Sequence, residues 1–275
     1  MSHIQLSPDH LCMPAAPARK LVLAAQNISK RYGARMAGGV TALSDVSFGI
    51  YEGELISIVG PSGCGKSTLL RALAGLTAPT EGKLSIDGEP LRAPSSKAAM
   101  VFQQPVLLPW RTIIENVLLP IEFRNLPIRP YRDRAHTLLG KVGLEGFENR
   151  YPHELSGGMQ QRAAIVRALI QEPQILLMDE PFGALDAMTR EQMTLDVLAL
   201  WAETGKTIVF VTHSITEAIF LSQRIFVMTA RPGKLTAIID IDLPFPRTLD
   251  LINTPRFGNY AGQVRELLNT QGDLS

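Results

Sequence analysis

Short apolar segments and helical patterns alternate along most of the chain. Residues 55–59 are apolar except for one serine, which predicts a buried strand, and a glycine-rich turn leads from them into a helical pattern at 66–74. The alternation continues as helix, strand, helix and strand, predicted at 159–171, 174–178, 191–203 and 207–212. Because buried strands that alternate with helices form parallel sheets, this pattern indicates a largely parallel α/β layer.

Three other stretches depart from this alternation. Residues 21–54 alternate in polarity and the turn residues Asp87 and Gly88 follow later, so we expect an antiparallel meander beside the parallel layer. Residues 105–151 have a helical pattern bounded by prolines, which predicts a subdomain inserted into the α/β core. Towards the end of the chain, an amphipathic pattern at 264–268 predicts a small terminal helix.

The apolar content is sufficient for a substantial core. Hydrophobic residues make up 45% of the 275 residues, which excludes a mainly disordered chain, while the length alone fits one large domain or two small ones. The longest uninterrupted apolar run, 197–202, has six residues, whereas a spanning helix needs roughly 20. We therefore expect a chain that does not cross a membrane. Residues 1–20 lack the order of a secretory signal and are expected to form an N-terminal tail.

The charge and the metal-binding residue types exclude several other classes. With 27 basic and 26 acidic residues the net charge is +1, so the chain has no overall field that would attract nucleic acid, and no nucleic-acid partner is expected. Cys12 and Cys64 form no CxxC pair, which favours a reducing compartment. Four of the histidines show no metal-ligand spacing: His3, His10, His136 and His153.

A phosphate-binding loop is predicted between the strand at 55–59 and the helix at 66–74. Its pattern of two glycines separated by four residues, then Lys and Ser, spans Gly60, Pro61, Ser62, Gly63, Cys64, Gly65, Lys66, Ser67 and Thr68. Backbone N–H groups of such a loop converge on phosphate oxygens, Lys66 reaches the β- and γ-phosphates, and the Ser67 hydroxyl can ligate Mg²⁺. The alternative, a turn that only caps a helix, does not explain why the motif directly follows a buried strand.

An acidic pair follows the strand predicted at 174–178. Asp179 is expected to hold Mg²⁺ through its waters, and Glu180 is expected to polarise the water that attacks the γ-phosphate. Such a pair by itself is usually a solvated strand end. Downstream of a phosphate-binding loop, it predicts a site that binds Mg²⁺ and activates water for hydrolysis of a bound phosphate.

A second glycine-rich helix start precedes this acidic pair. Ser156 and the amides of Gly157 and Gly158 would form another anion site at a helix N-terminus, suited to a γ-phosphate. Two half-sites in one chain suggest that each is completed by another subunit. The segment, which reads LSGGM from Leu155 to Met159, resembles the LSGGQ signature of the ATP-binding-cassette family.

The resemblance to this family implies roles for further residues. Gln103 is similar to the Gln-loop residue, which reaches Mg²⁺ and the attacking water from the hinge of the helical subdomain. Residues 183–186 resemble the D-loop, which acts across the dimer and ends here at Asp186. His213 resembles the switch histidine that contacts the γ-phosphate. Without the flanking motifs, Gln103 would be interpreted as a surface loop residue and His213 as a structural residue at a strand end.

The adenine contact and the loop cysteine lead to two more expectations. Tyr32 resembles the aromatic residue that stacks on adenine in the family, and Val40 is a second candidate because the segment 33–40 is longer than minimal. The Cys64 thiol would lie beside the phosphates at a helix N-terminus. We therefore expect that its pKa is lowered and that alkylation inhibits ATP hydrolysis unless ATP is bound.

The resemblance covers roughly 21–243 and implies a P-loop NTPase cassette. The implied fold is α/β, with a parallel-sheet core, an antiparallel β subdomain and an inserted α-helical subdomain at about 105–155. Residues 244–275 would form a short C-terminal extension behind the cassette.

The family also implies partners and a place in the cell. These are a second copy of the chain or a paralogous cassette, transmembrane permease subunits and, indirectly, an extracytoplasmic solute-binding protein, all at the cytoplasmic face of the inner membrane. Residues 107–112, 115–117 and 243–247 resemble the importer branch for nitrate, sulfonate, taurine and similar solutes. A cassette that powers another transporter, or a non-transport ATPase of the same family, is the alternative.

Overall fold

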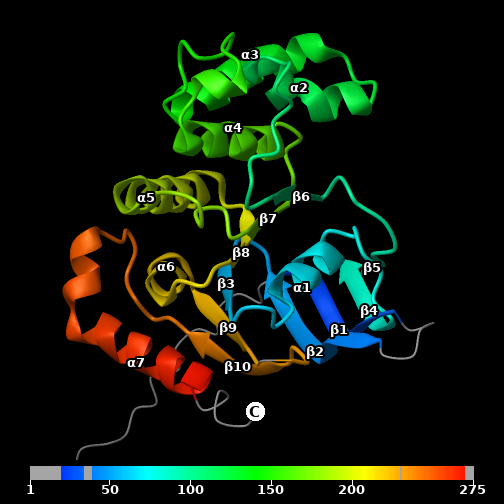
Figure 1. The fold of residues 1–275 in the computed structure, drawn as a ribbon, viewed down its shortest axis with the longest axis vertical. Coiled ribbons are helices and arrows are strands. Elements are labelled where there is room, and N and C mark those ends of the chain that lie inside the picture. Colours follow the sequence, from blue (N-terminus) through cyan, green and yellow to red (C-terminus); the bar gives the residue numbers. More distant parts are fainter. Residues whose placement is uncertain (1–19, 34–38, 230, 270–275) are drawn as a thin grey trace, which may run out of the picture.

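The computed structural model describes residues 20–33, 39–229 and 231–269. The predicted N-terminal tail therefore lies outside the described residues except for Lys20. The described strands form two sheets, a six-stranded one in the order β10-β9-β3-β8-β7-β6 and a four-stranded one in the order β2-β1-β4-β5 (Figure 1). Strands of the larger sheet are β3 (Leu55–Val59), β6 (Ala98–Val101), β7 (Ile175–Asp179), β8 (Thr207–Val211), β9 (Arg224–Met228) and β10 (Leu235–Asp240).

The larger sheet is the predicted parallel layer. Its strands β6, β7, β8, β3 and β9 pair in parallel, and only β10 pairs antiparallel, at one edge. The strands predicted at 55–59, 174–178 and 207–212 are confirmed to within one residue at each end. All residues of β3, β7 and β8 are buried because both faces of the sheet are covered.

Side chains on opposite faces of the larger sheet join two different hydrophobic clusters. Leu55 and Val59 pack with α5 (Ala187–Thr204), α6 (Ile215–Leu221) and the C-terminal helix, whereas Ile56 and Ile58 pack with α1 (Lys66–Leu73) and the smaller sheet. This alternation follows from the two-residue repeat of a strand. In Figure 1, α5, α6 and α7 (Pro255–Asn269) accordingly lie on one side of the sheet, and α1 lies on the other, against the smaller sheet.

The smaller sheet confirms the antiparallel prediction. It consists of β1 (Leu21–Tyr32), β2 (Val40–Tyr51), β4 (Glu81–Ile86) and β5 (Glu89–Pro90), all paired antiparallel. Asp87 and Gly88 connect β4 to β5 as the turn that the sequence predicts. Asn27 and Asp45 both have positive φ, and Asn27 Nδ2 donates to Asp45 Oδ1 across the β1–β2 pair at 2.7 Å.

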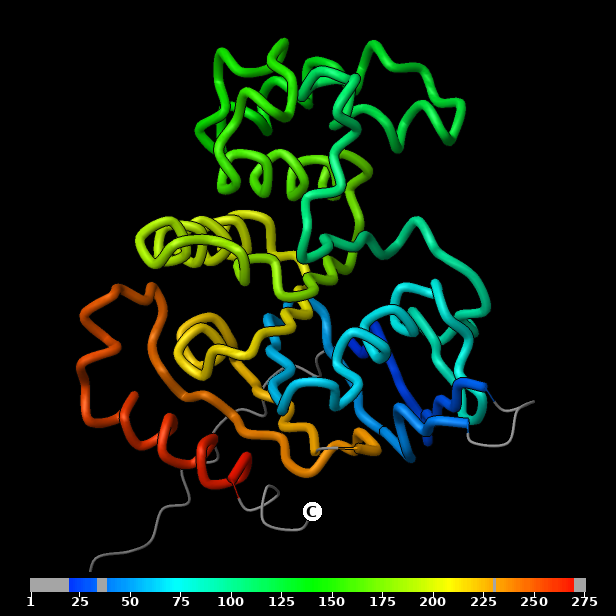
Figure 2. The backbone as a smooth tube through the Cα atoms, in the orientation of Figure 1, coloured from blue at the N-terminus to red at the C-terminus, as the bar shows by residue number. Residues whose placement is uncertain are grey.

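The proline-bounded segment forms a separate helical lobe with its own hydrophobic cluster. Its helices are α2 (Ile113–Phe123), α3 (Ile128–Lys141), the short 3-10 helix η1 (Pro152–Glu154) and α4 (Gly157–Leu169). The lobe lies at one end of the molecule and joins the sheet through two backbone segments (Figure 2). Helix α4 belongs to both parts, because Ala163 and Val166 pack inside the lobe and Ile165 and Leu169 pack against the sheet.

The C-terminal helix is longer than the sequence indicates. Helix α7 runs Pro255–Asn269, after the 3-10 helix η2 (Leu249–Asn253), whereas the amphipathic pattern predicts helix only at 264–268. Phe257 and Val264, two turns apart, are buried against α6 and the sheet. The first half of α7 carries few other apolar residues, so its pattern is too weak to identify before the docking surface is known.

Candidate nucleotide-binding site

The phosphate-binding loop connects β3 to α1 and surrounds an open pocket. Lys66 is the first residue of α1 and only 6% exposed, and its Nζ donates to the carbonyls of Gly60 at 2.9 Å and Pro61 at 3.2 Å. Gly65 precedes the helix with φ 98°, a conformation that a residue with Cβ rarely adopts. The pocket is lined by Ala42, Ser62, Gly63, Gly65, Lys66, Ser67, Thr68 and Glu180. The helix N-terminus and the buried ammonium make this pocket suitable for phosphate.

Ser67 and Asp179 form the candidate metal site beside this pocket. The Ser67 hydroxyl donates to Asp179 Oδ1 at 2.9 Å, which joins the start of α1 to the end of β7. Asp179 is 7% exposed, and burial raises its pKa above the usual value. Hard oxygen donors from a hydroxyl and a buried carboxylate fit Mg²⁺, and charge neutralisation by that ion would favour the ionised form of Asp179.

Glu180 lies between Lys66 and His213. Its Oε1 is 3.9 Å from Lys66 Nζ and its Oε2 is 3.4 Å from His213 Nδ1. Glu180 has φ 45°, an uncommon conformation for a residue with a side chain, and its N–H donates to the Val211 carbonyl at 3.0 Å. The β7–β8 register thus brings the acidic residue and the histidine together at the carboxyl ends of two neighbouring strands.

Gln103 reaches the same place from the strand on the other side of β7. A Cβ added to Gly183 would lie 3.4 Å from Gln103 Nε2, 3.5 Å from the Glu180 carbonyl and 4.0 Å from His213 Cε1. The three predicted catalytic residues therefore meet around Gly183, although they lie far apart in the sequence.

The second half-site lies apart from the phosphate pocket of the same chain. Ser156 is the N-cap of α4, where its hydroxyl accepts from the Met159 N–H at 3.3 Å. A Cβ on Gly158 would lie 2.6 Å from Thr189 Cγ2 of α5, and one on Gly157 would lie 3.8 Å from Leu185 Cδ2. Neither Ser156 nor the two glycines line the pocket around Lys66.

Asp186 caps helix α5. Its Oδ1 accepts from the Thr189 N–H at 3.0 Å and its Oδ2 accepts from the Thr189 hydroxyl at 2.6 Å, and these bonds lower the pKa of the carboxyl. The cap defines where the predicted D-loop ends and the helix begins.

Tyr32 and Val40 are paired across β1 and β2. Tyr32 is 43% exposed and Val40 is 61% exposed, so one flat aromatic face and one aliphatic side chain are available side by side. Lys30 Nζ lies 5.2 Å from the centre of the Tyr32 ring. Residues 34–38, which connect the two strands, lie outside the described part of the chain.

The expectation of a lowered pKa for Cys64 is wrong. Burial raises the pKa of the Cys64 thiol, and the opposing effects of Lys66 and of nearby backbone N–H groups are smaller. Cys64 is 1% exposed, and its Sγ lies 2.7 Å from where a Cβ on Gly60 would be. The side chain is therefore packed beneath the loop and does not line the pocket, and desolvation outweighs the effect of the helix N-terminus.

Sequence reasoning missed two contacts that support the loop from below. A Cβ on Gly233 would overlap the Cys64 carbonyl oxygen and would lie 3.1 Å from the Ala42 carbonyl oxygen, to which the Gly233 N–H donates at 3.0 Å. The Arg231 guanidinium lies 3.0 Å from a Cβ placed on Gly63. The Arg-Pro-Gly turn was visible in the sequence, but its contact with the loop depends on the pairing of β9 with β3.

Comparison with known proteins gives one consistent family. Residues 43–183 match the family model described as ABC transporter. An uncharacterised ABC transporter ATP-binding protein of Methanocaldococcus jannaschii is 47% identical over 252 residues, which are 92% of this chain and 93% of that protein. A taurine import ATP-binding protein of Rhizobium johnstonii is 43% identical over 92% of this chain and 98% of that protein.

Further relatives include a sulfonate importer subunit and a solved dimer. An aliphatic sulfonates import ATP-binding protein of Bacillus cereus is 44% identical over 81% of this chain and 87% of that protein. A dimeric structure of the ATP-binding cassette MJ0796 in a post-hydrolysis state, bound to ADP and phosphate, has a TM-score of 0.70 at 37% identity, covering 81% of this chain and 100% of that chain.

Proposed function

The chain belongs to the ABC transporter family, and from this premise we propose that it hydrolyses ATP as one half of a cassette dimer that powers the import of a small solute. Sulfonates, taurine or nitrate are the proposed solutes. Two relatives named as sulfonate and taurine import ATP-binding proteins, each more than 40% identical to this chain, support this solute class. The match to a cassette bound to ADP and phosphate supports the activity.

One observation carries the dimer proposal. The phosphate pocket around Lys66 and the anion site at Ser156 belong to different parts of the chain, and the second does not line the first. In a head-to-tail dimer, Ser156, Gly157 and Gly158 of each subunit would cover the γ-phosphate held by the other subunit. The dimeric relative supports this arrangement, in which either a second copy or a paralogous cassette serves as partner.

Within each site, the residues take separate parts of the reaction. Lys66 and the amides of the loop would bind the phosphates. Ser67 and Asp179, which are hydrogen-bonded to each other, would hold Mg²⁺, and Gln103 would reach it from beyond the end of β6. When bound, Mg²⁺ neutralises charge on the β- and γ-phosphates. Glu180 orients the attacking water, and His213 contacts the γ-phosphate. Tyr32 and Val40 bind the adenine, and Asp186 ends the D-loop that meets the partner.

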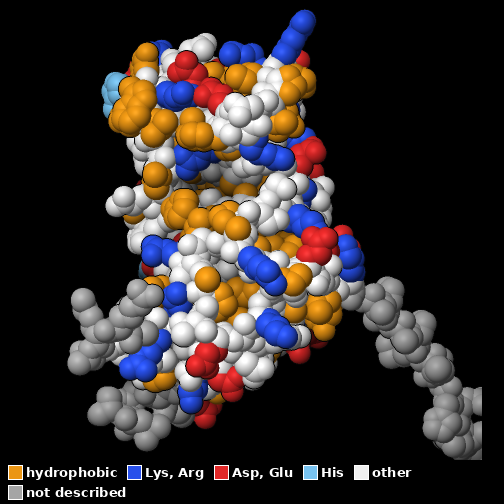
Figure 3. Space-filling model, turned by 90° about the vertical axis from the view of Figure 1, so that its right-hand side faces the viewer, with side chains coloured by type: hydrophobic (Ala, Val, Ile, Leu, Met, Phe, Trp, Pro, Cys, Tyr) orange, Lys and Arg blue, Asp and Glu red, His pale blue; other side chains and the backbone are white. Residues whose placement is uncertain are grey.

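The helical lobe is the proposed docking surface for permease subunits. It exposes large apolar side chains, with Val106 59%, Trp110 71% and Phe123 79% accessible. Figure 3 shows hydrophobic side chains gathered over the lobe at the top of the view. No helix within the described residues has the length and apolar character of a membrane span. We place the protein at the cytoplasmic face of the inner membrane, where its permease would receive the solute from an extracytoplasmic binding protein.

The domain organisation follows the same proposal. The tail at 1–20 precedes a cassette at 21–243, in which 105–155 form the helical subdomain, and 244–275 form the C-terminal extension. Helix α4, which packs with both parts, joins the helical subdomain to the sheet.

A mixing experiment tests the composite site. Lys66→Ala removes the phosphate lysine and Ser156→Glu places a negative charge where the γ-phosphate would bind, so each variant alone is expected to lose ATP hydrolysis in the reconstituted transporter. A mixed dimer retains one site with Lys66 from one subunit and Ser156 from the other, and its activity is expected to return in part. Failure of the mixture to recover any activity would contradict the dimer, and uptake of radiolabelled taurine, sulfonates and nitrate by the wild-type complex tests the solute class.

A further inference from the structure

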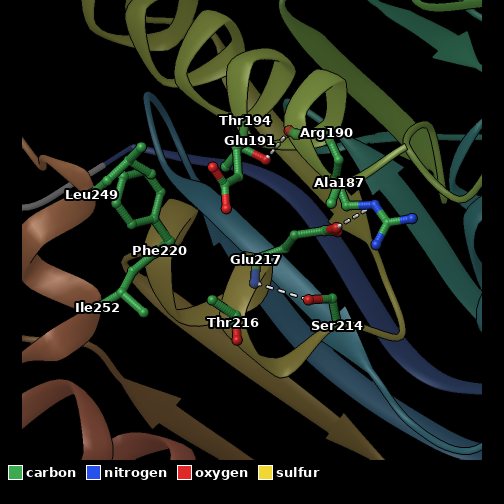
Figure 4. Close-up of a pocket in the computed structure, with 10 residues that line it drawn as sticks. All are labelled: Ala187, Arg190, Glu191, Thr194, Ser214, Thr216, Glu217, Phe220, Leu249 and Ile252. Atoms are coloured by element: carbon green, nitrogen blue, oxygen red, sulfur yellow. Dashed lines mark hydrogen bonds and ion pairs between the residues drawn. The ribbon is translucent and has the colours of Figure 1, made fainter. Parts of the chain in front are cut away.

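The loops that carry Glu180 and His213 are joined by a chain of side-chain contacts beneath the site. Residues 181–186 follow Glu180 and lead into α5, while residues 212–214 carry His213 and lead into α6. Arg190 of α5 and Glu217 of α6 connect these two loops. Figure 4 shows the two side chains facing each other from their helices, at one side of the pocket between α5, α6 and η2.

Arg190 holds the first loop. Its guanidinium donates to the Leu185 carbonyl at 2.8 Å and to the Phe182 carbonyl at 3.4 Å, so one side chain binds both ends of the turn 182–185, which overlaps the predicted D-loop. The same Nε lies 3.7 Å from Glu217 Oε1. An arginine presents several donors in a rigid fork, which suits it to bind carbonyls and a carboxylate at once.

Glu217 and Thr212 hold the second loop. The Thr212 hydroxyl donates to Glu217 Oε2 at 2.6 Å and accepts from the Ser214 N–H at 3.0 Å. Thr212 and Ser214 are the two neighbours of His213 in the chain, so the backbone on both sides of the histidine is fixed by this carboxylate–hydroxyl pair. Thr212 is 3% exposed, and the Glu217 side chain is 11% exposed, so water does not readily replace these bonds.

The role of these contacts follows from the positions of His213 and Glu180, which the two loops carry. His213 Nδ1 and Glu180 Oε2 are 3.4 Å apart, and this separation depends on the relative position of the two loops. We propose that Arg190, Glu217 and Thr212 are positioning residues that hold the D-loop and the His213 loop in one geometry, so that a shift of the D-loop is passed to the histidine. The inference rests on the proposed ATP hydrolysis at this site.

Charge and packing favour this role over a general stabilising one. Burial raises the pKa of the Glu217 carboxyl, so keeping the group ionised depends on Arg190 and on the Thr212 hydroxyl. The Arg190 side chain is 35% exposed and that of Glu217 is 11% exposed, and such a partly buried ion pair contributes little net stability to a fold.

The test measures steady-state ATP hydrolysis of the reconstituted transporter with four variants. Glu217→Gln keeps the size and an acceptor for Thr212 but removes the charge facing Arg190, and Arg190→Gln removes the donors to the D-loop. Thr212→Val removes the hydroxyl, and Thr212→Ser retains it. We expect kcat to fall about tenfold or more in the first three variants, KM for ATP to stay within twofold of wild type, and Thr212→Ser to retain most of the activity.

Glu191→Gln is the matched control. Glu191 is the neighbour of Arg190 on α5, lines the same pocket and is exposed, so its variant makes the same chemical change without touching either loop. The loss of kcat in the double variant Arg190→Gln/Glu217→Gln is expected to be far smaller than the product of the two single losses. Either single change already breaks the contact between the two side chains, so the second change has less left to remove.

Several results would overturn the inference. These are a Glu217→Gln variant with wild-type kcat, a loss that appears in KM instead of kcat, a Thr212→Ser variant as inactive as Thr212→Val, or an equal loss in Glu191→Gln. Thermal unfolding and equilibrium binding of ATP show whether each variant is folded. If the wild-type complex itself does not hydrolyse ATP, the proposed function fails; if only the variants behave as wild type, the positioning role fails.

Discussion

His213 Nδ1 lies 3.4 Å from Glu180 Oε2, at the carboxyl ends of two neighbouring parallel strands. The residues are brought together by the register in which Asp179 pairs with Val211, so each follows its strand by one or two positions on the same edge of the sheet. Glu180 also lies 3.9 Å from Lys66 Nζ. The carboxylate proposed to orient the attacking water is thus held between the two groups proposed to contact the phosphates.

Replacement of Glu180 by Gln is expected to separate ATP binding from ATP hydrolysis. The amide keeps the size and the contact with His213 but cannot orient water as a carboxylate does, so turnover is expected to fall at least about a hundredfold. The affinity for ATP should stay within about threefold, because Lys66 and the loop amides are unchanged. Steady-state phosphate release and equilibrium binding measure the two effects. Glu145→Gln, on the exposed surface of the lobe, is the control, and near wild-type turnover in Glu180→Gln would remove Glu180 from this role.

Gly233→Ala is expected to weaken nucleotide binding without touching the nucleotide. The added Cβ would overlap the Cys64 carbonyl oxygen and crowd the Ala42 carbonyl, so the phosphate-binding loop has to move. We expect ATP affinity to fall about tenfold or more, measured by titration with a fluorescent ATP analogue. Gly258→Ala in α7 meets open space and should leave affinity unchanged while raising helix stability by about 0.5–1 kcal/mol. Equal affinities in the two variants would show that Gly233 does not support the loop.

Alkylation of Cys64 is expected to be slow in the folded protein. The thiol is 1% exposed and burial raises its pKa, so little reactive thiolate is available at neutral pH. In a Cys12→Ser background, iodoacetamide should label Cys64 at least about a hundredfold more slowly in native conditions than in urea, as followed by mass spectrometry. A labelling rate in native protein that matches the unfolded rate would contradict the buried position.

Asn116→Asp is expected to loosen the loop that precedes α2. Asn116 is fully buried; its Nδ2 donates to the carbonyls of Leu108, Arg111 and Thr112, and its Oδ1 accepts from the Leu108 N–H at 2.7 Å. A carboxylate cannot donate to these carbonyls, so we expect a loss of about 2–3 kcal/mol in the unfolding free energy of the lobe. Hydrogen exchange at 105–123 measures the loss.

Asn125→Asp is the matched control for that change. Asn125 is exposed and has φ 52°, which Asp also tolerates, so exchange in the lobe should remain as in wild type. If Asn116→Asp exchanges no faster than Asn125→Asp, the buried hydrogen bonds of Asn116 contribute nothing to the loop.

Asp87 is expected to make stability depend on pH in the acid range. Hydrogen bonds from Lys20, and then from Lys97 and Gln174, lower its pKa from 3.8 to about 2. Because the folded-state pKa is depressed, the stabilisation is fully present above about pH 5 and is lost as pH falls from 4 towards 2. Allowing for solvent screening, we expect Asp87→Asn to lower the free energy of unfolding by about 1 kcal/mol at pH 7.

Urea unfolding at several pH values checks this dependence. The difference in unfolding free energy between wild type and Asp87→Asn should narrow as pH falls below 4. The control Asp250→Asn, at an exposed position, should have the same unfolding free energy as wild type at every pH. A gap that stays constant down to pH 3 would mean that the stabilisation does not depend on the Asp87 charge.

The phosphate-binding loop and the parallel strands were predictable because their causes are local. Three buried strands were placed to within a residue at each end, since a short apolar run between a turn and a helix has few alternatives. Gly65 and Lys66 stand in consecutive positions of one motif, and backbone geometry brings them into the pocket. The weak apolar pattern of α7 was not sufficient to predict the full helix. Phe257 and Val264 stabilise it by packing against α6 and the sheet, and this surface is known only from the fold.

The sequence by itself thus determined the α/β cassette, the motifs and the identity of the charged groups in the site. Only the tertiary structure decided that Cys64 is buried beneath its loop, that Gly233 supports it, and that Arg190 meets Glu217. The physical reason is that desolvation and close contact depend on all atoms around a group, most of which come from distant strands. A motif shows which side chains are present. The fold determines which of these side chains are exposed to water and which of them are in contact with one another.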